Sequence, residues 1–237
     1  MPTRETVLDA LSGVRDPELD EPITDLGFVS ELQIEGDAVG VRLRLPTYFC
    51  APNFAYLMVA DAKEAALSVT GVERATVVLD EHYASDELNH NLNADGDFDD
   101  AFPGETEGPD LDELRTTFRR KAFVSRQEQL CRTLLSNGRT PQELYGVRLG
   151  DVRPSGDFDK YLERRAELGL SISPEAPLVV DPDGNAVPEA AVVQHLRFAR
   201  TVKVSIEGNA GLCRGLLKTR YGGEHGIGQS EEREVTV

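Results

Sequence analysis

The sequence predicts an α+β protein, in which a small α-β-β-α-β domain precedes an acidic linker and a mixed α/β region. Three observations indicate this class. Apolar residues near the N-terminus recur at helical spacing, and the two segments after them alternate between apolar and polar residues as strands do. A stretch rich in Asp, Asn, Gly and Pro then separates this part from the remainder. We therefore expect a domain over 1–85, a linker over 86–109 and a further region over 110–237.

The first elements are a helix and a hairpin. A helix is predicted over 3–14, where Gly13 lies at the position of a helix stop and the apolar residues are Val7, Leu8, Leu11 and Val14. Residues 27–45 alternate in period two on both sides of Gly36-Asp37, which predicts two antiparallel strands joined by a tight turn.

A second helix and a third strand complete the predicted domain. The helix follows Pro52, because proline suits the first turn of a helix, and it extends over 53–69. The strand is predicted within 71–80, where Gly71 precedes its apolar residues.

The predicted linker is strongly acidic. Between Ala75 and Leu114 there are thirteen Asp and Glu residues and no Lys or Arg. Such a composition buries little apolar surface, which is typical of a linker or a long loop. Residues 91–100 partly match a calcium-binding loop, but Phe102 stands where a bidentate Glu is needed, so a solvated acidic loop is the better interpretation.

The last region is predicted to contain both helices and strands. Helices are expected over 108–138, 140–147, 157–170, 188–199 and 209–222, a short hairpin over 176–188, and a strand over 200–208.

Composition excludes several function classes. The net charge of −17 argues against a nucleic-acid partner, because phosphate binding needs clustered Lys and Arg. The charge-free run 45–60 is too short to cross a bilayer, and the N-terminus lacks the apolar segment of a signal peptide. We therefore expect a cytoplasmic protein without membrane contact, whose cysteines are thiols rather than disulfides.

Cys50 is the candidate functional residue. It falls in the loop between the second strand and the helix after Pro52, where the helix dipole favours an anion such as a thiolate. Thr47 is placed to add a hydroxyl hydrogen bond. A buried structural thiol remains the alternative, since free cysteines usually act as small hydrophobes. Cys131 and Cys213 lie in amphipathic helices and are interpreted as core thiols, His195 as a packed residue and His82 as a surface residue.

Two motifs in this domain resemble an iron–sulfur assembly domain family, which includes SufT, the PaaD protein of phenylacetate oxidation and the eukaryotic cytosolic iron–sulfur targeting factors. The first motif consists here of Asp16, Pro17, Glu18, Ile23, Asp25, Leu26, Gly27 and Val29. The second consists of Thr47, Cys50 and Pro52, with Ala51 between the cysteine and the proline. The resemblance covers about residues 3–85 and includes the α-β-β-α-β order.

The resemblance implies a role in maturing iron–sulfur or other iron proteins, with Cys50 as the residue that contacts iron or a cluster transiently. Thiolate is a suitable soft ligand. Asp16, Glu18 and Asp25 are candidate oxygen ligands, although turn and capping roles are favoured for them. The implied partner is a client metalloprotein, and a homodimer would pool two cysteines.

Two other functions remain open. One is a non-metal assembly chaperone or an accessory protein of a multicomponent di-iron oxygenase, in which Cys50 would be a core residue. The other is an enzyme with a Cys50 nucleophile, but no histidine lies near it in the sequence to serve as a base. The sequence therefore favours an accessory factor over an enzyme.

Overall fold

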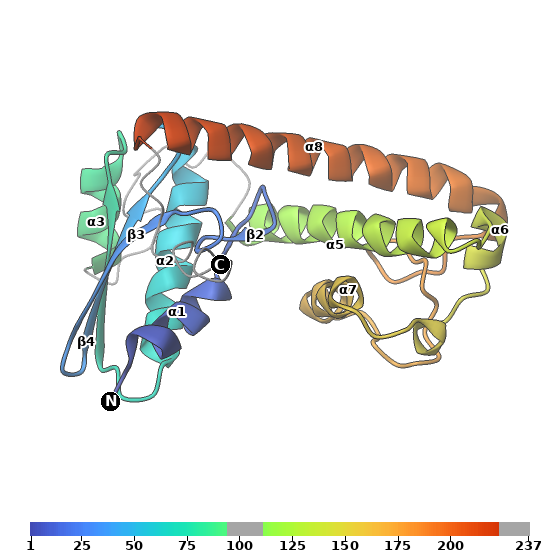
Figure 1. The fold of residues 1–237 in the computed structure, drawn as a ribbon, viewed down its shortest axis with the longest axis horizontal. Helices are drawn as coiled ribbons and strands as arrows, with labels where there is room; N and C mark the ends of the chain where they lie inside the picture. The colour runs from blue at the N-terminus through green and yellow to red at the C-terminus, as the bar shows by residue number, and fades with distance from the viewer. Residues whose placement is uncertain (94–110, 223–237) are drawn as a thin grey trace, which may run out of the picture. The chain divides into compact units, whose positions relative to one another are not determined.

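The computed structural model describes residues 1–93 and 111–222. The chain divides into two compact units (Figure 1): the first consists of Met1–Leu111 with Asn209–Val237, and the second of Asp112–Gly208. Both small sheets of the described residues lie in the first unit, and the second is mainly helical. The α+β class is therefore confirmed.

The first unit begins with the predicted helix. α1 (Arg4–Ser12) starts at a capping box, in which the side chain of Thr3 accepts the N–H of Thr6 and the side chain of Thr6 accepts the N–H of Thr3. It ends before Gly13. Two short strands, β1 (Arg15–Asp16) and β2 (Glu21–Pro22), then pair antiparallel.

The main sheet has three strands in the order β3-β4-β5. β3 (Val29–Glu35) and β4 (Ala38–Arg44) form the predicted hairpin, and Gly36 takes a positive φ of 65° in the turn, which suits glycine. α2 (Pro52–Ser68) then connects β4 to β5 (Arg74–Asp80), which runs parallel to β4. A crossover helix of this kind is the usual connection between parallel neighbours.

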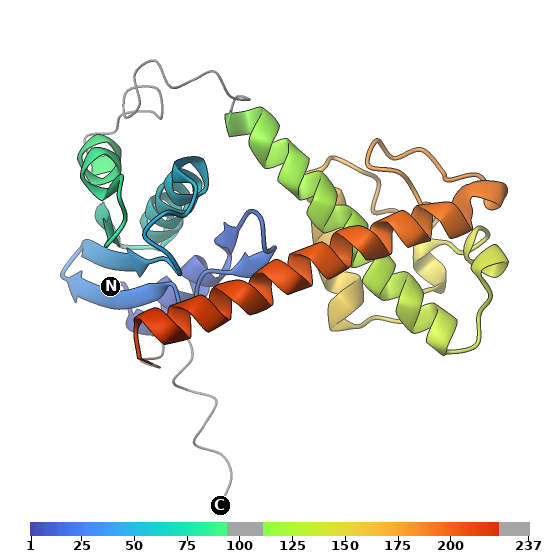
Figure 2. The same cartoon turned by 90° about the horizontal axis from the view of Figure 1, so that it is seen from above.

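Apolar and polar residues alternate along the strands, so the apolar side chains form the core on one face of the sheet. Apolar side chains from that face are buried together with those of α1 and α2, among them Val7, Leu11, Leu32, Val39, Val41, Leu43, Ala55, Met58, Val77 and Leu79. α2 packs against the sheet and α1 packs against α2. Figure 2 shows α2 and α3, teal and green, on the same side of the strands.

A third helix, α3 (Ser85–Asn93), occupies the beginning of the stretch that was predicted to be a linker. Its apolar residues Leu88 and Leu92 are buried in the core of the first unit, and α3 packs against β5. The first unit thus extends beyond residue 85, where its end was predicted. The physical reason is that Ala84, Leu88 and Leu92 follow one another at intervals of four residues, which is enough to bury one face of an otherwise polar helix.

The second unit contains the predicted helices α5 (Leu111–Ser136), α6 (Pro141–Leu144) and α7 (Gly156–Glu167), and two short 3-10 helices, Leu149–Asp151 and Glu189–Ala191. The predicted hairpin over 176–188 is reduced to an isolated bridge between Val180 and Ala186. The core of this unit contains a polar network. In it, Gln127 Nε2 donates to the Tyr161 hydroxyl at 2.8 Å, and Arg165 donates to the carbonyl of Pro177 at 2.8 Å.

The predicted strand over 200–208 is wrong, because these residues belong to the long helix α8 (Val192–Arg220). Val202, Val204 and Ile206 alternate as in a strand, but burial follows the helical period: Ala199, Lys203, Ala210 and Leu217 are buried, whereas Val204 is exposed. The end of this helix, from Asn209 onward, belongs to the first unit. The helix α8 therefore has residues in both units.

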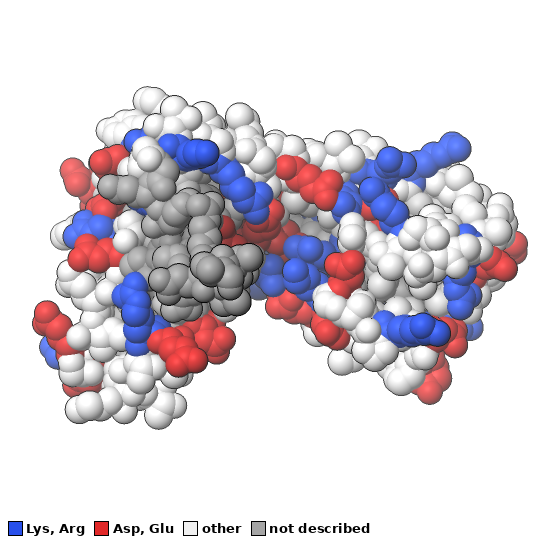
Figure 3. Space-filling view, viewed as in Figure 1, with Lys and Arg blue, Asp and Glu red and all other residues white. Residues whose placement is uncertain are grey.

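The surface in Figure 3 carries acidic and basic side chains that lie interspersed rather than gathered by sign. Among residues 1–93 and 111–222, no helix combines the length and the apolar character needed to span a bilayer.

Candidate functional site

Cys50 lies in the loop that connects β4 to α2, as predicted. β4 ends at Arg44, and α2 begins at Pro52 with Ala51 as its N-cap residue. Pro52 fits the first turn, where no helical hydrogen bond is lost through its missing N–H. Cys50 is therefore placed one residue outside the helix N-terminus.

The thiol of Cys50 is half-buried, and it hydrogen-bonds with the hydroxyl of Thr47, with 3.3 Å between Sγ and Oγ1. The expected contact between these two residues is present. Oγ1 of Thr47 also accepts the backbone N–H of Phe49 at 3.2 Å. Its own proton therefore remains available to be donated to the sulfur once the thiol has ionised.

His82 holds the backbone of Cys50, and it is buried with 2% exposure, so its prediction as a surface residue is wrong. Its Nε2 lies 2.7 Å from the carbonyl oxygen of Cys50, and its Nδ1 lies 3.3 Å from the backbone nitrogen of Ala84. A carbonyl only accepts and a backbone N–H only donates, so the ring is neutral with its proton on Nε2. Because both nitrogens bind the main chain, His82 orients the loop and does not serve as a base for the thiol.

Burial lowers the pKa of His82, the hydrogen bond to Cys50 opposes this, and the charge of Arg220 lowers it further. We therefore expect His82 to titrate below the ordinary value of about 6.5. Its contribution to stability is present above about pH 6.5 and is lost as the pH falls, because the unfolded state then binds the proton more readily. Long-range ¹H–¹⁵N spectra of the imidazole measure both pKa and tautomer, and a pKa above 6.5 or a proton on Nδ1 at neutral pH would contradict this arrangement.

The first motif forms a capped turn between β1 and β2. Oδ1 of Asp16 accepts the backbone N–H groups of Glu18 at 2.8 Å and Leu19 at 3.0 Å, as the favoured capping role requires. Burial raises the pKa of Asp16 to about 6, although these hydrogen bonds lower it in part. Asp25 is exposed, and its carboxylate accepts the hydroxyl of Thr24 at 3.4 Å.

The predicted metal ligands do not form a complete site. Within the described ranges 1–93 and 111–222, no group of three or more His, Cys, Asp or Glu side chains is arranged to hold a metal ion. The assignment of Cys50, Asp16, Glu18 and Asp25 to metal therefore stays a prediction. Most of the loop tested for calcium, 94–100, lies outside the described residues.

The end of α8 contacts the first motif and two segments next to the Cys50 loop, a contact that sequence reasoning missed. Asn209 Nδ2 donates to Glu18 Oε1 at 3.1 Å, and Arg220 donates to the carbonyl of Leu45 at 3.1 Å and to Glu81. Cys213 lies between them and is half-buried, unlike Cys131, which is buried as predicted. The signal for this face was available, since Asn209, Cys213, Leu217 and Arg220 recur at helical spacing.

Three exposed aromatic rings adjoin the Cys50 loop. Phe49 is 76% exposed, Tyr48 47% and Tyr83 46%. The ring centroid of Tyr48 lies 5.0 Å from that of Phe49, and the centroid of Phe49 lies 6.0 Å from that of Tyr83. The N–H of Tyr83 donates to the carbonyl of Tyr48 at 3.1 Å, which joins the two segments. Clustered exposed rings of this kind are typical of a protein-binding surface.

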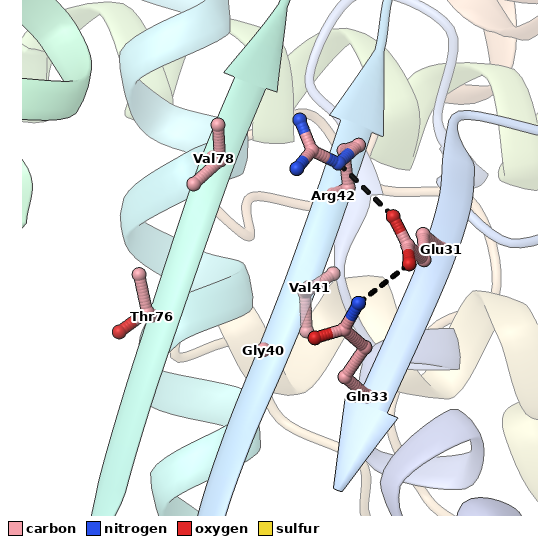
Figure 4. A pocket seen from close by; sticks show the side chains of 7 residues that line it. All are labelled: Glu31, Gln33, Gly40, Val41, Arg42, Thr76 and Val78. Atoms are coloured by element: carbon pink, nitrogen blue, oxygen red, sulfur yellow. Dashed lines mark hydrogen bonds and ion pairs between the residues drawn. The ribbon is translucent and has the colours of Figure 1, made fainter.

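A shallow depression lies on the sheet face opposite the core (Figure 4), above Gly40. Its polar side chains bind one another: Arg42 pairs with Glu31 at 3.1 Å, and Gln33 donates to Glu31 at 2.6 Å. Its lining contains no cysteine or histidine, so this depression is a weaker candidate for binding iron than the Cys50 loop.

Comparison with known proteins agrees with the two motifs. Residues 4–77 match a family described as iron-sulfur cluster assembly protein. A protein of Methanocaldococcus jannaschii, itself described as uncharacterized, is 34% identical over 94 residues, which is 39% of this chain and 96% of the relative. No solved structure matches.

The matched residues contain both motifs, Asp16 to Val29 and Thr47 to Pro52, together with β3, β4 and most of β5. The relative is covered over almost its whole length, so the similarity spans a complete domain. The chain therefore belongs to the iron-sulfur cluster assembly protein family and has a general role in iron–sulfur cluster assembly.

Proposed function

We propose that the protein delivers iron or an iron–sulfur cluster to a client metalloprotein, with Cys50 as the residue that holds the cargo. The observation that carries this proposal is the setting of the thiol. It is half-buried in a loop next to a helix N-terminus, beside the Thr47 hydroxyl and fixed through its own carbonyl by His82. Such a loop presents sulfur in one orientation without enclosing it.

An incomplete ligand set suits transfer better than storage. A thiolate is a soft ligand that iron and iron–sulfur clusters prefer. Because the described residues offer no enclosed set of three or more ligands, the remaining coordination positions of the cargo are open to a partner. The cargo is then bound weakly enough to move on to a client that supplies more thiolates.

The exposed rings Tyr48, Phe49 and Tyr83 support a protein partner at this position. A client that reaches the sulfur of Cys50 also meets Phe49, the preceding residue. Burial of exposed aromatic side chains is a common source of binding energy at protein interfaces. We assign the second unit to the selection of the client, since the family match does not extend into it.

Anaerobic titration with ferrous iron and sulfide tests the role of Cys50. We expect a thiolate-to-iron absorption band that is lost in Cys50→Ala and retained in Cys131→Ala, because Cys131 is buried in the second unit. Circular dichroism confirms that both variants fold. The iron content of the client, measured after incubation with each variant, should fall only for Cys50→Ala.

An unchanged band in Cys50→Ala would show that the thiol does not hold iron. If client assembly also stayed normal, the accessory or chaperone function without metal would become the better explanation.

A further inference from the structure

The Cys50 loop, residues 45–51, is hydrogen-bonded to the loop that follows β5, residues 81–84. His82 Nε2 donates to the carbonyl of Cys50 at 2.7 Å, and the backbone N–H of Tyr83 donates to the carbonyl of Tyr48 at 3.1 Å. We call this set of contacts the loop junction. The orientation of Cys50 therefore depends on a second loop that lies 32 residues further along the chain.

Arg220, near the end of α8, binds the first residue of each loop. Its Nη1 donates to the carbonyl of Leu45 at 3.1 Å, and its Nη2 donates to the carbonyl of Glu81 at 2.5 Å. The parallel strands β4 and β5 end just before these two residues, so one guanidinium group links the chain where the strand pairing stops. A guanidinium presents its donors in a fixed planar fork, which suits two acceptors at set positions.

The backbone of Glu81 is strained at this point. Its φ is 48°, in the left-handed region that residues with a side chain rarely adopt. Such a conformation persists where surrounding contacts fix it. Arg220 supplies these contacts, because it binds the Glu81 carbonyl and, at 3.2 Å, the Glu81 carboxylate. The turn at Glu81 in turn brings His82, the next residue, to the carbonyl of Cys50.

The end of α8 is itself anchored in the first unit. Leu217 is buried in the core of that unit, and Tyr221 packs against the same core. The guanidinium of Arg44 lies 4.6 Å from the centroid of the Tyr221 ring, and that of Arg220 lies 5.2 Å from the same centroid. A cation placed over an aromatic ring is attracted to it. These contacts restrict the orientation from which Arg220 reaches the two loops.

We infer that Arg220 is a positioning residue of the Cys50 site, which holds the loop junction in the geometry that presents the thiol. Arg220 acts through the two loops and not through contact with the cargo. The inference rests on the proposed function, since it concerns how Cys50 is presented to iron. The family match ends at residue 77, so this positioning residue is an addition to the matched domain.

Hydrogen exchange followed by NMR tests the loop junction without iron. In Arg220→Ala we expect the backbone N–H of Tyr83 to exchange about tenfold faster than in wild type, because the two loops separate more often. The amides of β4 and β5 should change by less than about twofold, since the sheet itself stays paired. An unchanged rate at Tyr83 would overturn the inference, and so would an equal acceleration throughout the sheet.

Two further variants separate the link between the loops from the charge and from general helix docking. Arg220→Lys keeps the charge but lacks the planar fork, so Tyr83 should still exchange several-fold faster than in wild type. Arg214→Ala removes the same charge and an ion pair with Glu21 from the same helix end, away from the Cys50 loop, and should leave the Tyr83 rate unchanged. Wild-type behaviour of Arg220→Lys, or an equal effect of Arg214→Ala, would contradict the positioning role.

Anaerobic titration with ferrous iron and sulfide separates this inference from the proposed function. Arg220→Ala retains Cys50, so its thiolate-to-iron band should reach the wild-type intensity at saturation, with iron bound about fivefold more weakly because the loop must be ordered on binding. If Arg220→Ala binds iron as wild type does while Cys50→Ala loses the band, the positioning role fails and the proposed function stands. If Tyr83 responds as expected but Cys50→Ala keeps the band, Arg220 still sets the loop junction and the proposed delivery function fails.

Discussion

Replacement of Leu88 by alanine is expected to lower the free energy of unfolding of the first unit by about 2–5 kcal/mol. Leu88 is 0% exposed and belongs to the core under the sheet, where α3 packs against β5. Truncation removes buried apolar surface and leaves a cavity that the neighbouring helix and strand fill only in part. Urea unfolding followed by circular dichroism measures the change.

The neighbouring residue supplies the matched control. Glu87 lies on the exposed side of the same helix, so Glu87→Ala should change the free energy of unfolding by no more than about 0.5 kcal/mol. Both substitutions introduce alanine at adjacent positions, so the difference between them reports burial rather than helix propensity. If Leu88→Ala were as silent as Glu87→Ala, this stretch would behave as the linker that its composition suggests.

α3 shows why composition alone misjudged this stretch. Asp, Asn and Glu make up most of its sequence, so the mean hydropathy of the segment is polar in spite of its two leucines. What decides the structure is their spacing, since Ala84, Leu88 and Leu92 fall on one helix face and are all buried. A short polar helix of this kind gains its stability from packing against the sheet, and its own sequence does not show that surface.

The elements that depend on local signals were predicted. The hairpin around Gly36, the start of α2 at Pro52 and the loop position of Cys50 all follow from residues that are close in sequence. His82 and Cys213 were misjudged because their surroundings come from elsewhere in the chain. His82 is buried under a loop 32 residues away, and Cys213 packs against the core of the first unit, which is built mainly from residues near the N-terminus.

The strand predicted over 200–208 failed for a related reason. Val202, Val204 and Ile206 have a high intrinsic preference for strands, and they alternate with polar residues. Helical residues on both sides continue the 3.6-residue period through this segment, so the helix buries Ala199, Lys203 and Ala210 along one face. Tertiary packing on that face outweighs the local preference.

Asp16 should make the protein less stable as the pH rises between about 4 and 6. Burial raises the pKa of this carboxyl to about 6, against about 3.9 in an unfolded chain. Between these values the folded state holds more protons than the unfolded state, so the free energy of unfolding falls with increasing pH. The stabilisation is complete below about pH 4 and is lost by about pH 6, a change of about 2–3 kcal/mol.

Asp16→Asn is therefore expected to raise the free energy of unfolding at pH 7.5 by about 1–3 kcal/mol. The amide keeps an oxygen to accept the N–H groups of Glu18 and Leu19, and it removes the cost of a buried charge. Urea unfolding at pH 4 and pH 7.5 measures the effect, which should vanish at pH 4 where the wild-type carboxyl is protonated. Asp16→Ala is the control, since it also removes the charge but lacks the acceptor, and it should be less stable than Asp16→Asn at both pH values. Equal stability of Asp16→Asn and wild type at pH 7.5 would show that the carboxylate is not strained by burial. A gain in stability together with weaker iron delivery would show that the chain retains this costly buried charge for function.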